Sequence, residues 1–211
     1  MKDYDIVDWK QGRGKDILIL MELKENVASA MRGRERMSDD EVIKLGIHIC
    51  RALEYCDRHG LIHRDIKPET IFTSKFGDYK LGEFGAVWSS EWADTPKATV
   101  GTPAFMAPEV VFLDKPYDAR ADICSLGLTM YYLLNGKKLP FEGEYCDIAP
   151  ISRRLYDGEP PPVLDWVGDK LMSIVLKACA SNPEDRYCNA AEMRKALKRV
   201  KSSTKWKKRT P

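Results

Sequence analysis

The sequence is short of the features that mark membrane and secreted proteins. No apolar run among the 211 residues reaches the roughly 18 residues that a membrane-spanning helix needs. The first residues, Met1–Asp5, do not show the basic and apolar layout of a secretory signal peptide. The six cysteines stand singly, without the paired spacing of a zinc site or the density of a disulfide scaffold. We therefore expect a cytoplasmic protein with reduced thiols and no membrane span.

A large excess of one charge is also absent, because the formal net charge is only +2. The basic residues are nevertheless uneven: seven of them fall within residues 198–211, where there is no acidic residue. A basic tail can bind nucleic acid or an anionic surface, but it is more often a solvated chain end. We adopt the second interpretation and expect no nucleic-acid partner. The hydrophobic content of 44% predicts a single domain with one core.

Two β-prone runs open the chain, Tyr4–Trp9 and Asp16–Met21. They are joined by the glycine-containing segment Gln11–Gly14, a pattern typical of a β-hairpin. The segment has too few glycines, and no following strand with a lysine, to be a phosphate-binding loop. We expect it only to turn the chain.

Helical periodicity begins at Ser38, where Ser-Asp-Asp-Glu resembles a capping box. The apolar residues that recur at helical spacing behind it are Val42, Leu45, Ile49, Leu53 and Cys56. This helix is predicted to stop at His59–Gly60, and a short apolar strand follows at Leu61–Ile62. Two further helices are predicted near the end of the chain, at Asp169–Ala180 and Ala190–Val200.

Five short motifs then follow one another in a fixed order. They are His63–Thr70, Gly82–Gly85 behind the strand Tyr79–Leu81, Gly101–Glu109, Asp122–Gly127 in a strongly apolar helix, and Asn182–Arg186. Five such motifs in one order are difficult to obtain by chance. They resemble the catalytic loop, metal loop, end of the activation segment, central helix and closing arginine of the eukaryotic-type protein kinase family.

The resemblance covers nearly the whole chain and implies an α+β, mainly α-helical fold. It implies a partial kinase domain at 1–201, in which 1–24 form a residual β-hairpin of the N-terminal lobe with the hinge. Residues 25–201 would form the helical C-terminal lobe, and 202–211 a basic tail. The family transfers phosphate from ATP to serine or threonine residues of a protein substrate, with Mg²⁺ as the metal.

Two residues of the catalytic-loop motif match the carboxylate and the cation that take part in phosphoryl transfer in the family. Asp65 matches the carboxylate that orients the acceptor hydroxyl and takes its proton late, and Lys67 matches the cation that neutralises the transferring phosphate. The resemblance also implies the serine/threonine branch, because that branch pairs this lysine with the threonine found here as Thr102. Phosphoryl transfer depends mostly on such positioning and charge neutralisation.

The resemblance extends to regulation and to the scaffold. Arg64 resembles the arginine that receives an activation-loop phosphate in many relatives, a use that suits its bidentate fork. Thr99 is the first candidate acceptor of that phosphate. The other candidates are Ser89, Ser90 and Thr95. Glu109 and Arg186 match a buried ion pair, and Asp122 matches the carboxylate that binds the catalytic-loop backbone.

Both metal positions depart from the family pattern. Thr70 stands where the family has asparagine, and its hydroxyl reaches less far than an amide oxygen. Glu83 stands where the family has aspartate, which displaces the carboxylate by one methylene. Because the octahedral shell of Mg²⁺ is tight, these residues predict weakened metal binding.

The nucleotide site is represented in part. Met21, Glu22 and Lys24 lie in a segment that resembles the adenine-binding hinge, and Phe72 is the expected floor of the pocket. Only 20 residues precede this hinge, whereas three strands and a helix with the glycine-rich loop and phosphate-binding lysine need roughly 45–50. We expect ATP to bind weakly to this chain.

Three functions compete on these grounds. The first is a serine/threonine kinase that transfers phosphate from ATP to a protein, with impaired activity in this chain. The second is a pseudokinase scaffold or protein-binding module, which Thr70, Glu83 and the shortened N-terminal lobe favour. The third and weakest is a nucleic-acid-binding adaptor that acts through the basic tail.

Overall fold

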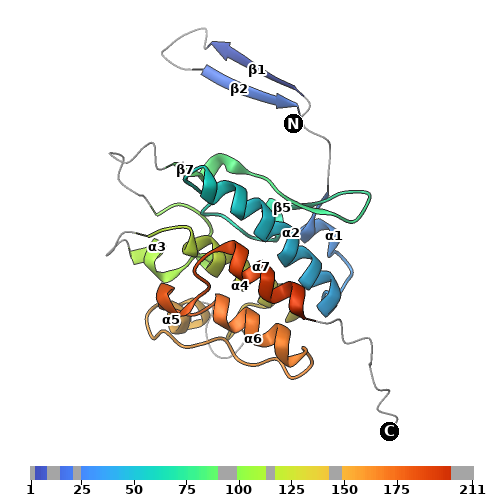
Figure 1. Ribbon diagram of the computed structural model, residues 1–211, viewed down its shortest axis with the longest axis vertical. Helices are drawn as coiled ribbons and strands as arrows, with labels where there is room; N and C mark the ends of the chain where they lie inside the picture. Colours follow the sequence, from blue (N-terminus) through green and yellow to red (C-terminus); the bar gives the residue numbers. More distant parts are fainter. Residues whose placement is uncertain are drawn as a thin grey trace.

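A computed structural model describes residues 3–8, 15–20, 25–89, 99–112, 117–142 and 149–200. Its helices are α1 (Val27–Ala30), α2 (Asp39–Arg58), α3 (Pro108–Phe112), α4 (Arg120–Leu134), α5 (Ala149–Leu155), α6 (Asp169–Ala178) and α7 (Ala190–Arg199). Its strands are β1 (Asp3–Asp8), β2 (Lys15–Leu20), β3 (Glu25–Asn26), β4 (Leu61–Ile62), β5 (Ile71–Thr73), β6 (Tyr79–Leu81) and β7 (Trp88–Ser89). Figure 1 shows the helices gathered in one body. The predicted basic tail at 202–211 lies outside the described residues.

The core forms around α4, where thirteen of the fifteen residues are buried. Helices α2 and α6 both pack against α4, and α7 packs against α2 and α6. The approach of α6 is close, because a Cβ atom at Gly127 would lie 2.8 Å from the Cβ of Ala178. The apolar character of α4 on every side is therefore explained by its burial on every side. None of the described helices is both long and apolar enough to cross a membrane.

The strands form three small antiparallel sheets. β1 pairs with β2 from Asp3 opposite Leu20 to Asp8 opposite Lys15, which confirms the predicted hairpin, although its expected ends at Trp9 and Met21 lie outside the described residues. β3, β5 and β6 form a second sheet, and β4 pairs with β7. The last two sheets flank the loop at 63–70, which carries the predicted catalytic residues.

The predicted helices are present, with small differences at their C-terminal ends. All five apolar residues expected on one face of α2 are buried, and the helix ends at Arg58 as expected. α6 ends at Ala178 because the N–H of Ala180 already bonds the carbonyl of Lys177, three residues back. Such tightening of a last turn is common. α7 ends one residue earlier than predicted, at Arg199.

The capping box at the start of α2 is confirmed. The Ser38 hydroxyl accepts the N–H of Glu41 at 3.3 Å, and the Glu41 carboxylate accepts the N–H of Ser38 at 2.9 Å. Arg34 donates to both oxygens of the same carboxylate, at 2.9 and 2.8 Å. The hydrogen bond from Arg34 is the main reason that the pKa of Glu41 falls to about 2.

The cap of α2 should therefore weaken in acid. Because folding lowers the pKa of Glu41, its contribution to stability is full above about pH 4.5 and is lost as the pH falls toward about 2. Urea unfolding of the wild type and Glu41→Gln, followed from pH 6 to pH 2.5, measures this contribution. We expect the difference between their midpoints to shrink below pH 4.5. A difference that stays constant over this range would contradict the assignment.

Candidate active site

The loop between β4 and the turn Pro68–Thr70 is anchored to α4 by one carboxylate. Asp122 of α4 accepts the backbone N–H groups of His63 and Arg64, both at 2.8 Å. The carboxylate is buried, and desolvation raises its pKa. Arg64 adopts a left-handed conformation, with φ of 68°, which the two hydrogen bonds help to hold. The structure thus contains the backbone contact expected of Asp122.

The imidazole of His63 links this loop to the segment after β6. Its Nε2 lies 2.8 Å from the carbonyl oxygen of Gly82, and the N–H of Asp65 points to its Nδ1 at 3.4 Å. These partners require that Nε2 carries the proton and that Nδ1 accepts. The buried imidazole of His63 therefore connects the start of the loop to Gly82, a contact that the sequence did not predict.

The side chains of Asp65, Lys67 and Thr102 form a closed triangle. The ammonium of Lys67 lies 2.9 Å from Oδ2 of Asp65 and donates to the hydroxyl of Thr102 at 2.5 Å. That hydroxyl donates in turn to Oδ1 of Asp65 at 2.8 Å. The side chains of Asp65 and Lys67 are 18% and 21% exposed. A carboxylate held in this way remains accessible and can accept a proton from an incoming hydroxyl.

A glycine lets Thr102 come this close to the loop. Gly101 has φ of +124°, and a Cβ atom there would lie 2.3 Å from the carbonyl oxygen of Arg64. Only glycine allows this backbone conformation and this contact together. The order Gly101–Thr102 therefore has a geometric reason, since the first residue makes room and the second reaches Asp65.

The two predicted metal positions, Thr70 and Glu83, differ in their hydrogen bonding and exposure. The Thr70 hydroxyl donates to the carbonyl oxygens of Asp65 and Lys67, at 2.8 and 3.1 Å, and accepts the N–H of Lys67 at 3.1 Å. Thr70 is 2% exposed. Glu83 is exposed and has a left-handed backbone, with φ of 59°. In the part of the chain that the structure describes, no group of three acidic, histidine or cysteine side chains could hold a metal ion. Of the two predicted positions, Glu83 therefore offers an exposed carboxylate ligand, whereas the Thr70 hydroxyl is engaged within the loop.

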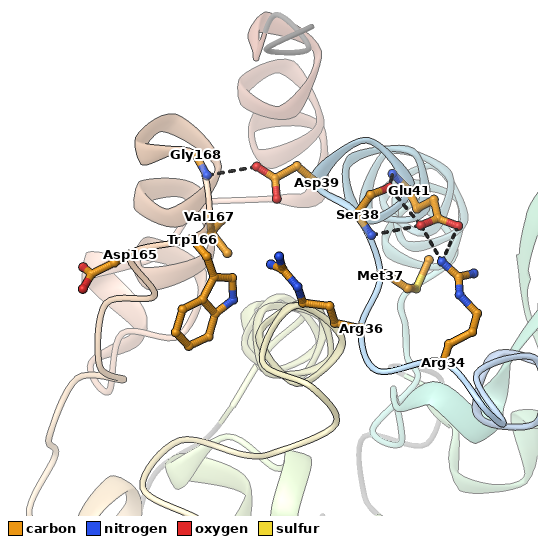
Figure 2. A pocket seen from close by; sticks show the side chains of 10 residues that line it. All are labelled: Arg34, Arg36, Met37, Ser38, Asp39, Glu41, Asp165, Trp166, Val167 and Gly168. Carbon is orange, nitrogen blue, oxygen red and sulfur yellow. Dashed lines mark hydrogen bonds and ion pairs between the residues drawn. The ribbon is translucent and has the colours of Figure 1, made fainter. Parts of the chain in front are cut away.

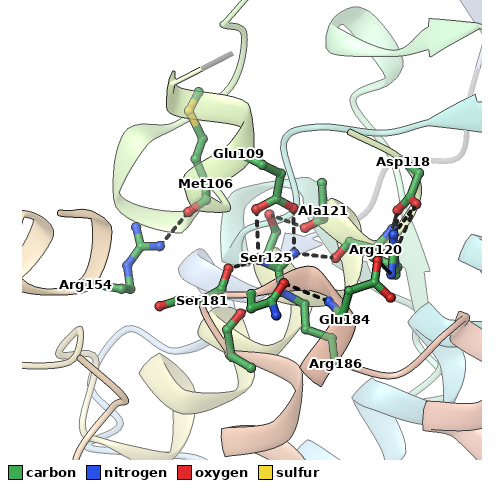
Figure 3. Close-up of polar contacts among 12 residues, drawn as sticks. Met106, Glu109, Asp118, Arg120, Ala121, Ser125, Arg154, Ser181, Glu184 and Arg186 are labelled. Carbon is green, nitrogen blue, oxygen red and sulfur yellow. Dashed lines mark hydrogen bonds and ion pairs between the residues drawn. The ribbon is translucent and has the colours of Figure 1, made fainter. Parts of the chain in front are cut away.

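The ion pair expected of Glu109 and Arg186 is present in the buried interior (Figure 3). The guanidinium donates to the two oxygens of Glu109 at 2.6 and 2.8 Å. It also donates to the carbonyl oxygens of Ala180, Ser181 and Arg120, at 2.7, 3.0 and 3.1 Å. The side chain of Arg186 is 0% exposed and that of Glu109 is 10% exposed. This pair ties α3 to the turn before α7.

The comparison with known proteins agrees with this geometry. The model of the protein kinase domain matches residues 5–199. The chain belongs to the protein kinase family. The serine/threonine-protein kinase PknB of Mycobacterium leprae is 36% identical over 170 residues, which are 79% of this chain and 27% of that protein. PknB of Mycolicibacterium smegmatis is 38% identical over 159 residues, which are 72% of this chain and 25% of that protein. The chain spans about a quarter of the length of these curated relatives.

These matches confirm the resemblance to eukaryotic-type serine/threonine kinases and the mainly helical kinase fold with small sheets. The nucleotide side of this kinase fold is described only in part. Phe72 lies in β5, and its ring would touch a Cβ atom at Gly82 at 2.8 Å. The predicted hinge residues Met21, Glu22 and Lys24 lie outside the described residues.

Arg64 and Thr99, the two residues expected to take part in regulation, have different hydrogen-bond partners among the described residues. Arg64 donates to the carbonyl oxygen of Ala86 at 2.6 Å and to the hydroxyl of Tyr117 at 3.3 Å. Thr99 donates instead to the carbonyl oxygen of Val111 at 3.5 Å. Of the other candidate acceptors, Ser89 is buried, and Ser90 and Thr95 lie outside the described residues. Phosphorylation at Thr99 remains a prediction.

One residue of the kinase lobe was missed by the sequence reading. Arg154 of α5 is 3% exposed and donates to the carbonyl oxygens of Met106, Pro103 and Ala104, at 2.6, 3.2 and 3.4 Å. Two adjacent arginines in a helix normally indicate a solvated face. Nothing in the sequence around Arg154 signals that this one turns inward.

A separate cavity of about 590 Å³ lies between the loops that precede α2 and α6 (Figure 2). Its lining residues are Arg34, Arg36, Met37, Ser38, Asp39, Glu41, Asp165, Trp166, Val167 and Gly168. Several polar groups there already serve the helix ends: Arg34 binds Glu41, and Asp39 accepts the N–H of Gly168 at 2.9 Å. None of the predicted kinase site residues lines this cavity.

Proposed function

We propose that this chain binds a protein segment containing serine or threonine and receives the acceptor hydroxyl at Asp65 for ATP-dependent phosphorylation. The observation that carries the proposal is the triangle of Asp65, Lys67 and Thr102. The carboxylate accepts the hydrogen bond of the acceptor hydroxyl, which displaces that of Thr102. Lys67, released toward the incoming phosphate, neutralises its charge. Thr102 holds both groups in register until the acceptor arrives.

Mg²⁺–ATP, when bound, supplies the phosphoryl group. Among the described residues Glu83 is the one that would hold the metal, because its carboxylate is exposed and stands at the position of the metal-binding aspartate of the family. Thr70 closes the loop on itself and would not take the place of a second metal ligand. A lost charged contact costs about 1.5–3 kcal/mol, so we expect transfer to be roughly 10- to 160-fold slower for each displaced ligand.

The test measures transfer of radiolabelled phosphate from ATP to a generic serine-containing protein. The chains compared are the wild type, Thr70→Asn/Glu83→Asp, and each of these with Asp65→Asn added. We expect transfer by the wild type to lie near the detection limit, the double variant to be at least about tenfold faster, and Asp65→Asn to abolish transfer in both. Equal silence of all four chains, with native circular dichroism spectra, would contradict the kinase proposal.

A second candidate function is a scaffold that binds a partner protein without catalysis. The closed hydrogen-bond network of Thr70 favours it, because this network holds the loop without any metal. The two functions separate in the experiment above, since a scaffold gains nothing from Thr70→Asn/Glu83→Asp. In either case we propose that the partner is a protein.

A nucleic-acid partner is not proposed. The cytoplasmic location stays a prediction from the cysteine pattern.

A further inference from the structure

Arg154 combines deep burial with an unusual set of partners. Its guanidinium donates to three backbone carbonyls, and all three belong to the short segment Pro103–Met106 (Figure 3 shows the bond to Met106). In the described part of the chain no carboxylate lies within ion-pair distance of it. Arg186, which is also buried, has Glu109 as its counterion.

Simple packing does not explain this arginine. A buried charge without an ionised partner is costly, and an apolar side chain of similar volume would fill the same space at lower cost. Among the described residues, the partners of the guanidinium are carbonyl oxygens, and its planar fork can reach several of them at once. Burial of Arg154 is therefore explained if it fixes the conformation of the Pro103–Met106 backbone, at a cost in the free energy of unfolding.

The segment Pro103–Met106 continues directly from the catalytic triangle. Thr102, immediately before it, contacts Asp65 and Lys67. Glu109, three residues after it, is fixed by Arg186. Both ends of the segment are therefore held by side-chain contacts, and Arg154 holds the part between them from α5.

We infer that Arg154 is a positioning residue that fixes the Pro103–Met106 backbone as the surface on which the acceptor peptide lies beside its serine or threonine. The inference rests on the proposed function, because a peptide whose hydroxyl reaches Asp65 passes next to Thr102 and the segment that follows it. Arg154 touches neither peptide nor nucleotide. It acts through the backbone that it holds.

Three variants separate this role from packing. Arg154→Met keeps the apolar volume and removes all three hydrogen bonds, whereas Arg154→Lys keeps the charge but loses the fork. Arg153→Met is the matched control, because the neighbouring Arg153 binds the carboxylate of Glu159 at 2.6 Å. Circular dichroism melts verify that all variants are folded.

The first measurement is amide hydrogen exchange at Phe105 and Met106, whose N–H groups bond Thr102 and Pro103 within this turn. We expect at least tenfold faster exchange in Arg154→Met, partial rescue in Arg154→Lys, and no change in Arg153→Met. The second measurement is the affinity of a fluorescent peptide pool with a fixed central serine, beside that of a fluorescent ATP analogue. We expect a tenfold weaker affinity for the peptide pool in Arg154→Met and an unchanged affinity for the nucleotide.

The outcomes separate the inference from the proposed function. Unchanged exchange at Phe105 and Met106 in Arg154→Met would overturn the positioning role. Faster exchange with unaltered affinity for the peptide pool would overturn the link to peptide binding. If no chain binds the pool, including the wild type, the proposed function fails, whereas the exchange result still decides whether Arg154 positions the segment.

Discussion

Replacing Arg186 with alanine is expected to lower the free energy of unfolding by about 3–5 kcal/mol, because it leaves a buried carboxylate without its counterion. Glu109 is 10% exposed and accepts two hydrogen bonds from the guanidinium, at 2.6 and 2.8 Å. The same substitution also removes the donors for three carbonyl oxygens, those of Ala180, Ser181 and Arg120. Urea denaturation followed by circular dichroism measures the loss.

Two further variants test whether the uncompensated charge of Glu109 causes the loss of stability in Arg186→Ala. Glu184→Gln breaks a surface pair, since Glu184 is 73% exposed and bonds Arg120 at 2.8 Å; exposed pairs contribute less than about 1 kcal/mol. Arg186→Met combined with Glu109→Met removes both charges, and we expect this double variant to lose less stability than Arg186→Ala. An unchanged midpoint in Arg186→Ala would show that the pair does not support the fold.

Much of the scaffold could be predicted because its signals are local. The capping box at Ser38 involves residues three positions apart, and the apolar spacing of α2 needs only one side of a helix to be buried. The ion pair of Glu109 and Arg186 was predicted by resemblance alone, because its partners lie 77 residues apart. No local pattern joins two such positions.

The parts that could not be predicted depend on tertiary contacts. The orientation of the Thr70 hydroxyl follows from the turn at Pro68, which brings the hydroxyl back to the carbonyl of Asp65. The inward turn of Arg154 follows from the packing of α5 on a segment about 50 residues earlier. A sequence motif gives the residue types at a site. The hydrogen bonds that their side chains form are determined by the tertiary structure.

Replacing Asp122 with alanine is expected to open the loop at 63–70 and to lower the free energy of unfolding by roughly 2–6 kcal/mol. The carboxylate accepts the N–H groups of His63 and Arg64, both at 2.8 Å, and it is 2% exposed. Each buried N–H that loses its acceptor costs about 1–3 kcal/mol. The loss also frees Arg64 from its left-handed backbone. Urea denaturation measures the global effect, and amide exchange at His63 and Arg64 measures the local one.

Asp122→Asn and Asp57→Ala are the controls. The asparagine keeps one acceptor oxygen, so we expect a loss between those of the wild type and Asp122→Ala, with one of the two amides still protected. Asp57 is an exposed aspartate of α2, and its replacement should change stability by less than about 0.5 kcal/mol. If Asp122→Ala unfolds at the wild-type urea concentration and its loop amides exchange at the wild-type rate, another contact must hold the loop. The placement of Asp65 would then not depend on α4.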